Sequence, residues 1–218
     1  MRLQSAIFDM DGTLLDSMPT WRELRPTFLK EAGISATPEQ DRMLHILADC
    51  DVIPYLREVC GLPWSQQEII DQIIQRMETF YSSQVRPKPG LEKFLSILKM
   101  EGVWMYVATA THRRLTEKAL KTAGIDHYFR GIVTSADAGN HKSESADIYE
   151  MAMRRLQSNK RDTVVFEDAL HAIRTAKAAG FRVAGVYEAT AEQDQPEIRR
   201  LCDYYIRSYE ELVQSETF

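Results

Sequence analysis

The chain has 218 residues, enough for one large core or for a core and a small second domain. Its formal net charge is −5 with both signs interspersed, which argues against nucleic acid or an anionic membrane surface as the main partner. Cys50, Cys60 and Cys202 form no C-x-x-C pair, so they predict reduced thiols and neither a disulfide framework nor a zinc site. No apolar run has the length of a signal peptide or of a bilayer span, so we expect a cytoplasmic protein.

Short apolar runs alternate with helical patterns along most of the chain. The runs cover residues 5–8, 103–108, 131–134, 163–166 and 182–186. Most are apolar at consecutive positions, as in parallel strands that are covered on both faces. Gly124 and Gly180 stand where helices between these strands should end. This alternation predicts an α/β core with a doubly wound, Rossmann-like parallel sheet.

One interval, residues 18–84, contains only helical patterns. Two helix starts can be read in it from the Ser/Thr-x-x-Glu/Gln pattern of a capping box. One pairs Thr37 with Gln40, and the other pairs Ser65 with Glu68. The interval therefore predicts a separate group of helices.

The segment at 86–90, Arg-Pro-Lys-Pro-Gly, resembles a stiff connector because both prolines restrict the backbone. It returns the chain from the helical interval to the next strand. We therefore expect a helical cap of residues 17–87, inserted into an α/β core of residues 1–16 and 88–218.

Acidic residues follow two of the predicted strands. In a strand, residues i and i+2 point to the same side, so Asp9 and Asp11 can project together while Met10 faces away. Glu167 and Asp168 follow a later strand in the same way. Ligand sites in open α/β sheets collect at these carboxyl ends. Several carboxylates in one place favour a hard cation such as Mg²⁺.

Each acidic pair also has a simpler interpretation. Asp and Gly are common in turns, so residues 9–12 could be only a turn. Asp168 could be the N-cap of the helix that follows it. A calcium-binding loop is excluded, because its sixth and twelfth positions here hold Leu14 and Thr20 in place of Gly and Glu.

A hydroxyl and an ammonium group join these carboxylates at the ends of predicted strands. Thr109 ends the second predicted strand, and Lys142 follows the third. A lone Thr is often only a strand former, and a lone Lys is often only a solvated loop residue. Together, however, the carboxylates, the hydroxyl and the ammonium group are what phosphoryl transfer requires, since that reaction depends on positioning and on charge neutralisation.

The order and spacing of these residues resemble the haloacid dehalogenase superfamily, most of whose members are phosphatases. DMDGTLLDS, from Asp9, resembles its first motif, Thr109 its second, Lys142 its third, and FEDA, from Phe166, its fourth. A helical insert directly after the first motif is similar to the small-cap subgroup that includes β-phosphoglucomutase and phosphoglycolate phosphatase. One departure is KSESADIY, where such members often have Lys-Pro-x-Pro-Asp.

The resemblance implies a role for each acidic residue. Asp9 would attack phosphorus and form an aspartyl phosphate. Asp11 would protonate the leaving oxygen and later activate water, which requires a raised pKa. Mg²⁺ would be held by Asp9, the backbone carbonyl of Asp11 and Asp168, with Glu167 as a direct or a water-mediated ligand.

The resemblance also implies that Thr109, Ala110 and Lys142 hold phosphoryl oxygens. The residues that would contact the rest of the substrate are less clearly marked. Thr111, His112 and Arg113 begin a predicted helix beside Thr109, and Trp21 lies in the first helix of the cap. Each is a candidate substrate contact, with a polar helix start or simple packing as the alternative.

The function expected from these residues is a Mg²⁺-dependent phosphatase of a small phosphorylated metabolite, of the sugar-phosphate, phosphoglycolate or nucleotide type. A β-phosphoglucomutase-like mutase is the alternative, but such mutases carry a histidine where this chain has Trp21. A phosphorylatable receiver domain is about half this length and lacks a cap, and an inactive binding protein would not keep every chemical position filled. We expect a monomer or a weak dimer.

Overall fold

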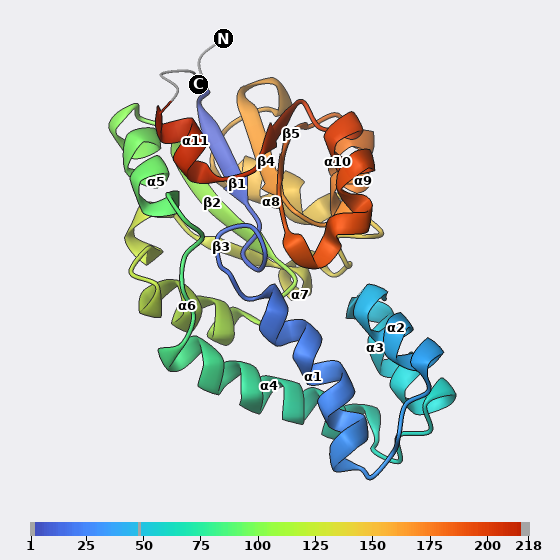
Figure 1. Cartoon of the computed structure of the whole chain (residues 1–218). Coiled ribbons are helices and arrows are strands. Elements are labelled where there is room, and N and C mark those ends of the chain that lie inside the picture. Colours follow the sequence, from blue (N-terminus) through green and yellow to red (C-terminus); the bar gives the residue numbers. More distant parts are fainter. Residues whose placement is uncertain (1–2, 48, 215–218) are drawn as a thin grey trace. The chain divides into compact units, whose positions relative to one another are not determined.

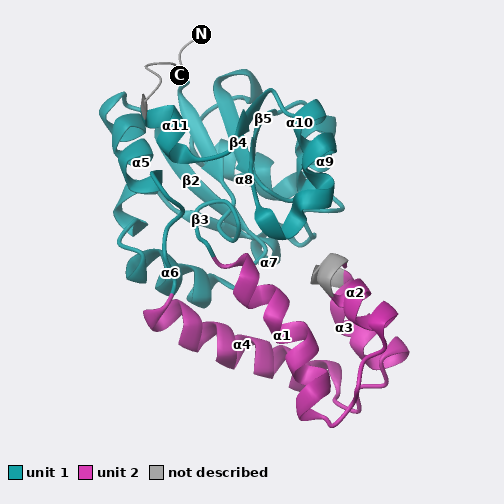
Figure 2. Cartoon of the chain, in the orientation of Figure 1, with its two compact units in different colours: residues 1–16, 85–218 teal, residues 17–84 magenta. Residues whose placement is uncertain are grey.

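The computed structural model describes residues 3–47 and 49–214. Two compact units can be distinguished, one made of residues 1–16 and 85–218 and the other of residues 17–84 (Figure 2). The first unit contains the sheet, and the second contains only helices among its described residues. The side chain of Cys50 lies outside the described residues.

The first unit is built on one sheet of six parallel strands, in the order β3-β2-β1-β4-β5-β6 (Figure 1). The strands are β1 Ser5–Phe8, β2 Trp104–Thr109, β3 Ile132–Thr134, β4 Thr163–Glu167, β5 Arg182–Val186 and β6 Tyr204–Ile206. This confirms the predicted doubly wound α/β core. The sequence pattern predicts no strand at β6, because three residues at a sheet edge are too few to establish a hydrophobic pattern.

Helices alternate with these strands. They are α5 Leu91–Met100, α6 Arg113–Thr122, α7 Ser135–Ala138, α8 Asp147–Arg155, α9 Leu170–Ala178, α10 Gln195–Leu201 and α11 Tyr209–Gln214. Short 3₁₀ turns are η2 Asp126–Tyr128, η3 Lys160–Asp162 and η4 Ala189–Asp194. Gly124 and Gly180 follow α6 and α9 with φ of +74° and +85°, a conformation that glycine adopts without strain and that ends a helix.

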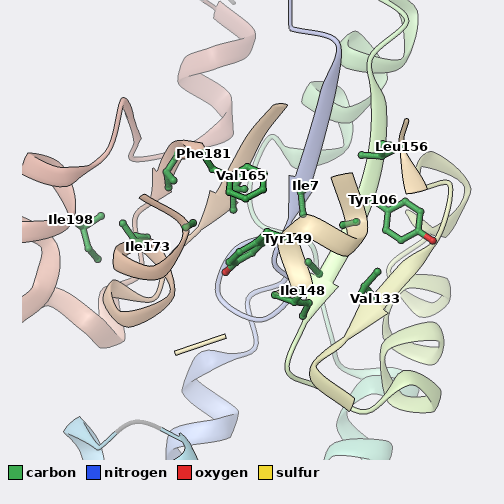
Figure 3. Close-up of a cluster of buried hydrophobic side chains, with 14 residues drawn as sticks. Ile7, Tyr106, Val133, Ile148, Tyr149, Leu156, Val165, Ile173, Phe181 and Ile198 are labelled. Atoms are coloured by element: carbon green, nitrogen blue, oxygen red, sulfur yellow. The ribbon is translucent and has the colours of Figure 1, made fainter. Parts of the chain in front are cut away.

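Alternate strand residues face the two sides of the sheet, and helices cover both sides. On one side, Ile7 and Val165 pack in a cluster with α8 and α9 residues such as Tyr149 and Ile173 (Figure 3). On the other side, the Phe8 and Phe166 rings stack with centroids 4.3 Å apart, and Phe94 of α5 packs on Phe166. Burial on both faces explains why these strands are apolar at consecutive positions.

The segment after the helical unit pairs with the segment before it. Leu15 forms a β-bridge with Pro87, and the Lys88 amide donates to the Leu14 carbonyl oxygen at 2.9 Å. The Lys88 ammonium group also contacts Glu188 Oε2 at 2.8 Å; Glu188 is buried and lies just after β5, and Lys88 is partly exposed. Residues 85–87 are therefore part of the first unit, and the compact helical unit ends at residue 84.

The helical unit contains α1 Met18–Glu31, α2 Pro38–Ile46, α3 Asp49–Pro54, the π-helical turn η1 Tyr55–Val59 and α4 Gln66–Ser83. Both predicted capping boxes are present. Thr37 and Gln40 close the start of α2, and Ser65 and Glu68 close the start of α4. Each box satisfies amide groups that the first turn of a helix leaves without partners.

No helix among the described residues combines the length and the apolar character that crossing a membrane requires.

Candidate active site

Three carboxylates meet at the carboxyl ends of the two central strands. Asp9 follows β1, Glu167 is the last residue of β4, and Asp168 comes next. Phe8 pairs with Phe166 in the parallel register, so both strands end at the same level. One oxygen of each carboxylate lies within 4.8 Å of the others, and the three residues are 3%, 0% and 4% exposed. The sequence predicts these residues at strand ends, and the structure brings them into one buried cluster.

A buried cation enters this cluster. The Lys142 ammonium nitrogen lies 2.8 Å from Asp9 Oδ1 and 2.7 Å from Glu167 Oε1. Lys142 is itself buried, in the turn between α7 and α8. Buried charges of this kind are stable only when they are paired. The loop lysine selected from the sequence is therefore an internal ion-pair partner and not a solvated residue.

One ammonium group does not balance three carboxylates, as the pKa directions show. Burial raises the pKa of Glu167 well above its usual range, and the nearby Asp9 raises it further, while Lys142 opposes both. Burial and then Asp9 raise the pKa of Asp168 to about 7. Burial alone would lower the pKa of Lys142, but the charges of Asp9 and Glu167 outweigh it, so that pKa is raised well above its usual value. The cluster is therefore short of positive charge.

The same residues fit a divalent cation. Glu167 Oε2 is buried and has no hydrogen-bond partner among residues 3–47 and 49–214. Buried polar atoms are rarely left in this state unless an ion or a water satisfies them. Carboxylate oxygens are the ligands that hard cations prefer. Asp9, Glu167 and Asp168 could therefore hold a metal ion.

Two residues to which the sequence analysis gave no role support Asp168. The Thr13 hydroxyl donates to Asp168 Oδ1 at 2.8 Å, and the Tyr209 hydroxyl donates to the Thr13 carbonyl oxygen at 3.2 Å. Thr13 lies inside the sequence motif that begins at Asp9, so that motif could have identified it. Tyr209 lies 196 residues from Thr13, and no sequence pattern points to it as a site residue. The alternative of Asp168 as an N-cap is wrong, because Ala169 occupies that position before α9.

Asp11 lies in the turn after β1 and is linked to the end of β2. Gly12 takes a φ of +82°, and its amide donates to the Leu15 carbonyl oxygen at 2.9 Å, which forms the turn. The Thr111 hydroxyl donates to Asp11 Oδ2 at 2.7 Å. The Thr111 amide donates to Thr109 Oγ1 at 3.1 Å. Asp11 and Thr109 are thus connected through one residue.

The other predicted phosphate or substrate contacts near the end of β2 are Ala110, His112 and Arg113. Ala110 is exposed directly after β2. The His112 imidazole is the N-cap of α6 and accepts from the Arg114 amide. The Arg113 guanidinium donates to Asp137 Oδ2 at 2.7 Å and to the Ile132 carbonyl oxygen at 3.0 Å.

Trp21 lies in the helical unit, where its indole N–H donates to the Tyr81 hydroxyl at 3.1 Å. This bond joins α1 to α4. Trp21 therefore has a packing and hydrogen-bonding role within its own unit, whatever else it contacts.

Comparisons with known proteins agree with this arrangement. The haloacid dehalogenase-like hydrolase family matches residues 6–186. The phosphorylated carbohydrates phosphatase of Thermotoga maritima is 26% identical over 185 residues, covering 84% of this chain and 85% of that protein. Hexitol phosphatase B of Escherichia coli K12 is 26% identical over 221 residues, covering 99% and 96%.

The fold also matches solved structures. CbbY from Rhodobacter sphaeroides, in complex with xylulose-(1,5)bisphosphate, superposes with a TM-score of 0.78 at 22% identity, covering 96% of each chain. At this identity the likeness shows the fold alone. With a family match that spans most of the chain, however, the chain belongs to the haloacid dehalogenase-like hydrolases, as a phosphatase-type member with a helical cap inserted after β1.

Proposed function

We propose that this chain is a Mg²⁺-dependent phosphatase of a small phosphorylated metabolite, acting through an aspartyl phosphate on Asp9. The observation that carries the proposal is the position of Asp9, which is buried, paired with Lys142 and next to Glu167 and Asp168. The two curated relatives named above are phosphatases of phosphorylated carbohydrates and of hexitol phosphates, which supports a sugar-phosphate type of substrate.

The metal would be held by Asp9, Asp168 and the backbone carbonyl of Asp11, with Glu167 as a direct or water-mediated ligand. Mg²⁺ bound there would supply positive charge that offsets the repulsion between the anionic Asp9 and an anionic phosphate. The orphaned Glu167 Oε2 and the raised pKa values of Glu167 and Asp168 support this assignment, because each reflects a shortage of positive charge.

The chain's own residues carry the two transfer steps. Asp9 attacks phosphorus, so an Asp9–phosphorus bond forms while the bond to the leaving oxygen breaks, and Asp11 gives a proton to that oxygen. In the second step Asp11 removes a proton from water as the water oxygen attacks phosphorus and releases Asp9. Thr109, Ala110 and Lys142 hold the phosphoryl oxygens throughout.

Hydrolysis is favoured over a mutase reaction because this chain has Trp21 in place of a histidine. The related mutases carry a histidine at this place, whereas here the indole N–H is bonded to Tyr81. Without that histidine, we expect Asp11 to activate water as readily as a sugar hydroxyl. The helical unit, residues 17–84, would act as the cap that selects the substrate.

The test is a panel of phosphorylated sugars, phosphoglycolate and nucleotides, with phosphate release measured in the presence of Mg²⁺. One arm supplies β-glucose 1-phosphate with a trace of the 1,6-bisphosphate. We expect free phosphate from at least one sugar phosphate. Rapid formation of glucose 6-phosphate with little free phosphate would instead establish the mutase, and no turnover on the whole panel would refute both.

A further inference from the structure

The carboxyl group of Asp11 is held by a residue from another strand end. The Thr111 hydroxyl donates to Asp11 Oδ2 at 2.7 Å, and the two residues are 100 positions apart in the sequence. Thr111 is 8% exposed, so water competes little for this bond. A hydrogen bond to a carboxylate in such a place is strong and directional.

We propose that Thr111 is a positioning residue that fixes the Asp11 carboxyl group for proton transfer. The proposal rests on the function proposed above. Held by this bond, the Asp11 carboxyl group presents its proton in a fixed orientation. In the first step that proton goes to the leaving oxygen as the Asp9–phosphorus bond forms and the bond to the leaving oxygen breaks. In the second step the Asp11 carboxylate takes a proton from the attacking water as the Asp9–phosphorus bond breaks.

Thr111 suits this role because its own backbone is fixed on both sides. Its amide donates to Thr109 Oγ1 at 3.1 Å, and its carbonyl oxygen accepts from the Thr116 hydroxyl at 3.2 Å. Thr109 and Thr116 are both buried. The side chain of Thr111 is therefore held between the end of β2 and the first turns of α6, as a rigid support requires.

The contacts of Thr111 link the group that transfers the proton, Asp11, to a group that would hold the phosphate, Thr109. The Thr109 hydroxyl oxygen accepts from the Thr111 amide, which leaves the Thr109 hydroxyl hydrogen for donation to a phosphoryl oxygen. Thr111 thereby sets the orientation of the Thr109 hydroxyl through its backbone and that of Asp11 through its side chain. Asp11 lies in a turn after the strand, where side-chain rotation would misplace the proton unless it is held.

The experiment compares Thr111→Val, which removes the hydroxyl at nearly constant volume, with Thr111→Ser, which keeps it. The probes are p-nitrophenyl phosphate and phenyl phosphate, which differ only in the leaving group. p-Nitrophenolate leaves without a proton, whereas phenolate needs one from Asp11. Rapid mixing measures the first turnover, and steady-state assays give kcat and KM.

For Thr111→Val we expect the first turnover of phenyl phosphate to fall on the order of 10- to 100-fold, because proton transfer loses its positioned group. The first turnover of p-nitrophenyl phosphate should stay near the wild-type rate. Steady-state kcat should fall for both substrates, since water activation also uses Asp11, while KM changes little. Thr111→Ser should restore kcat.

The matched control is Thr163→Val, which removes a buried hydroxyl at the first residue of β4, at the opposite end of that strand from Glu167, where it donates to the Asn159 carbonyl oxygen. It should lower thermal stability and should affect phenyl phosphate and p-nitrophenyl phosphate equally. An equal fall for both leaving groups in Thr111→Val, an unchanged kcat, or no rescue by Ser would overturn the positioning role. A wild-type protein that releases phosphate neither from these probes nor from any member of the metabolite panel above would overturn the proposed function itself, and this inference with it.

Discussion

Lys142→Met should make the metal-free protein markedly less stable. The substitution removes the ammonium group that contacts Asp9 Oδ1 at 2.8 Å and Glu167 Oε1 at 2.7 Å. Removing one partner of a buried ion pair leaves an uncompensated charge and costs about 3–5 kcal/mol. Here two nearly inaccessible carboxylates lose their partner at once, so we expect the upper part of that range. For a chain of this size, about 4–5 kcal/mol corresponds to a fall in Tm of about 10–15 °C.

The assay is thermal and urea unfolding in EDTA at pH 8, followed by circular dichroism. Lowering the pH should narrow the gap between variant and wild type, because protonated Glu167 and Asp168 no longer need the cation. Lys177→Met is the matched control, since Lys177 pairs with Asp203 at 2.7 Å but is partly exposed. It should change stability by less than about 1 kcal/mol. Equal stability of Lys142→Met and wild type in EDTA would refute the reasoning.

Three further outcomes follow from the site. Asp9→Asn should abolish phosphate release, because it removes the nucleophile. Its Tm should stay near or above the wild-type value, because the substitution removes one charge from a crowded carboxylate cluster. Turnover at the wild-type rate would show that Asp9 is not the nucleophile. Activity should depend on Mg²⁺ and be inhibited by Ca²⁺, which prefers more ligands at longer distances; full activity after exhaustive chelation would contradict the metal role. In the metal-free folded protein the pKa of Asp168 is raised to about 7 from an ordinary 3.8. At pH values between these two, the folded state therefore keeps a proton on Asp168 that the unfolded state has lost. The free energy of unfolding should therefore fall by roughly 4 kcal/mol as pH rises from about 4 to 7 and stay low above it, and a flat profile over this window would contradict that burial effect.

The sequence by itself determined the class of fold and where its chemistry lies. Runs that are apolar at consecutive positions and alternate with helical patterns indicate strands covered on both faces, as in a parallel sheet between helix layers. Asp9 and Asp168 follow two such runs, and the register of Phe8 with Phe166 brings them together. Capping boxes at Thr37 and Ser65 are equally local, because a helix start is satisfied by residues three positions apart.

The tertiary structure alone decided how these residues act on one another. The order of motifs selected Lys142, but only packing shows that its ammonium group lies between Asp9 and Glu167. The bonds from Thr13 to Asp168 and from Thr111 to Asp11 join residues 155 and 100 positions apart. No local pattern encodes such pairs, because their geometry depends on where separate strands end. The strength of these ion pairs and hydrogen bonds also depends on the tertiary structure. The carboxylates and the ammonium group interact strongly only after the surrounding core has excluded water.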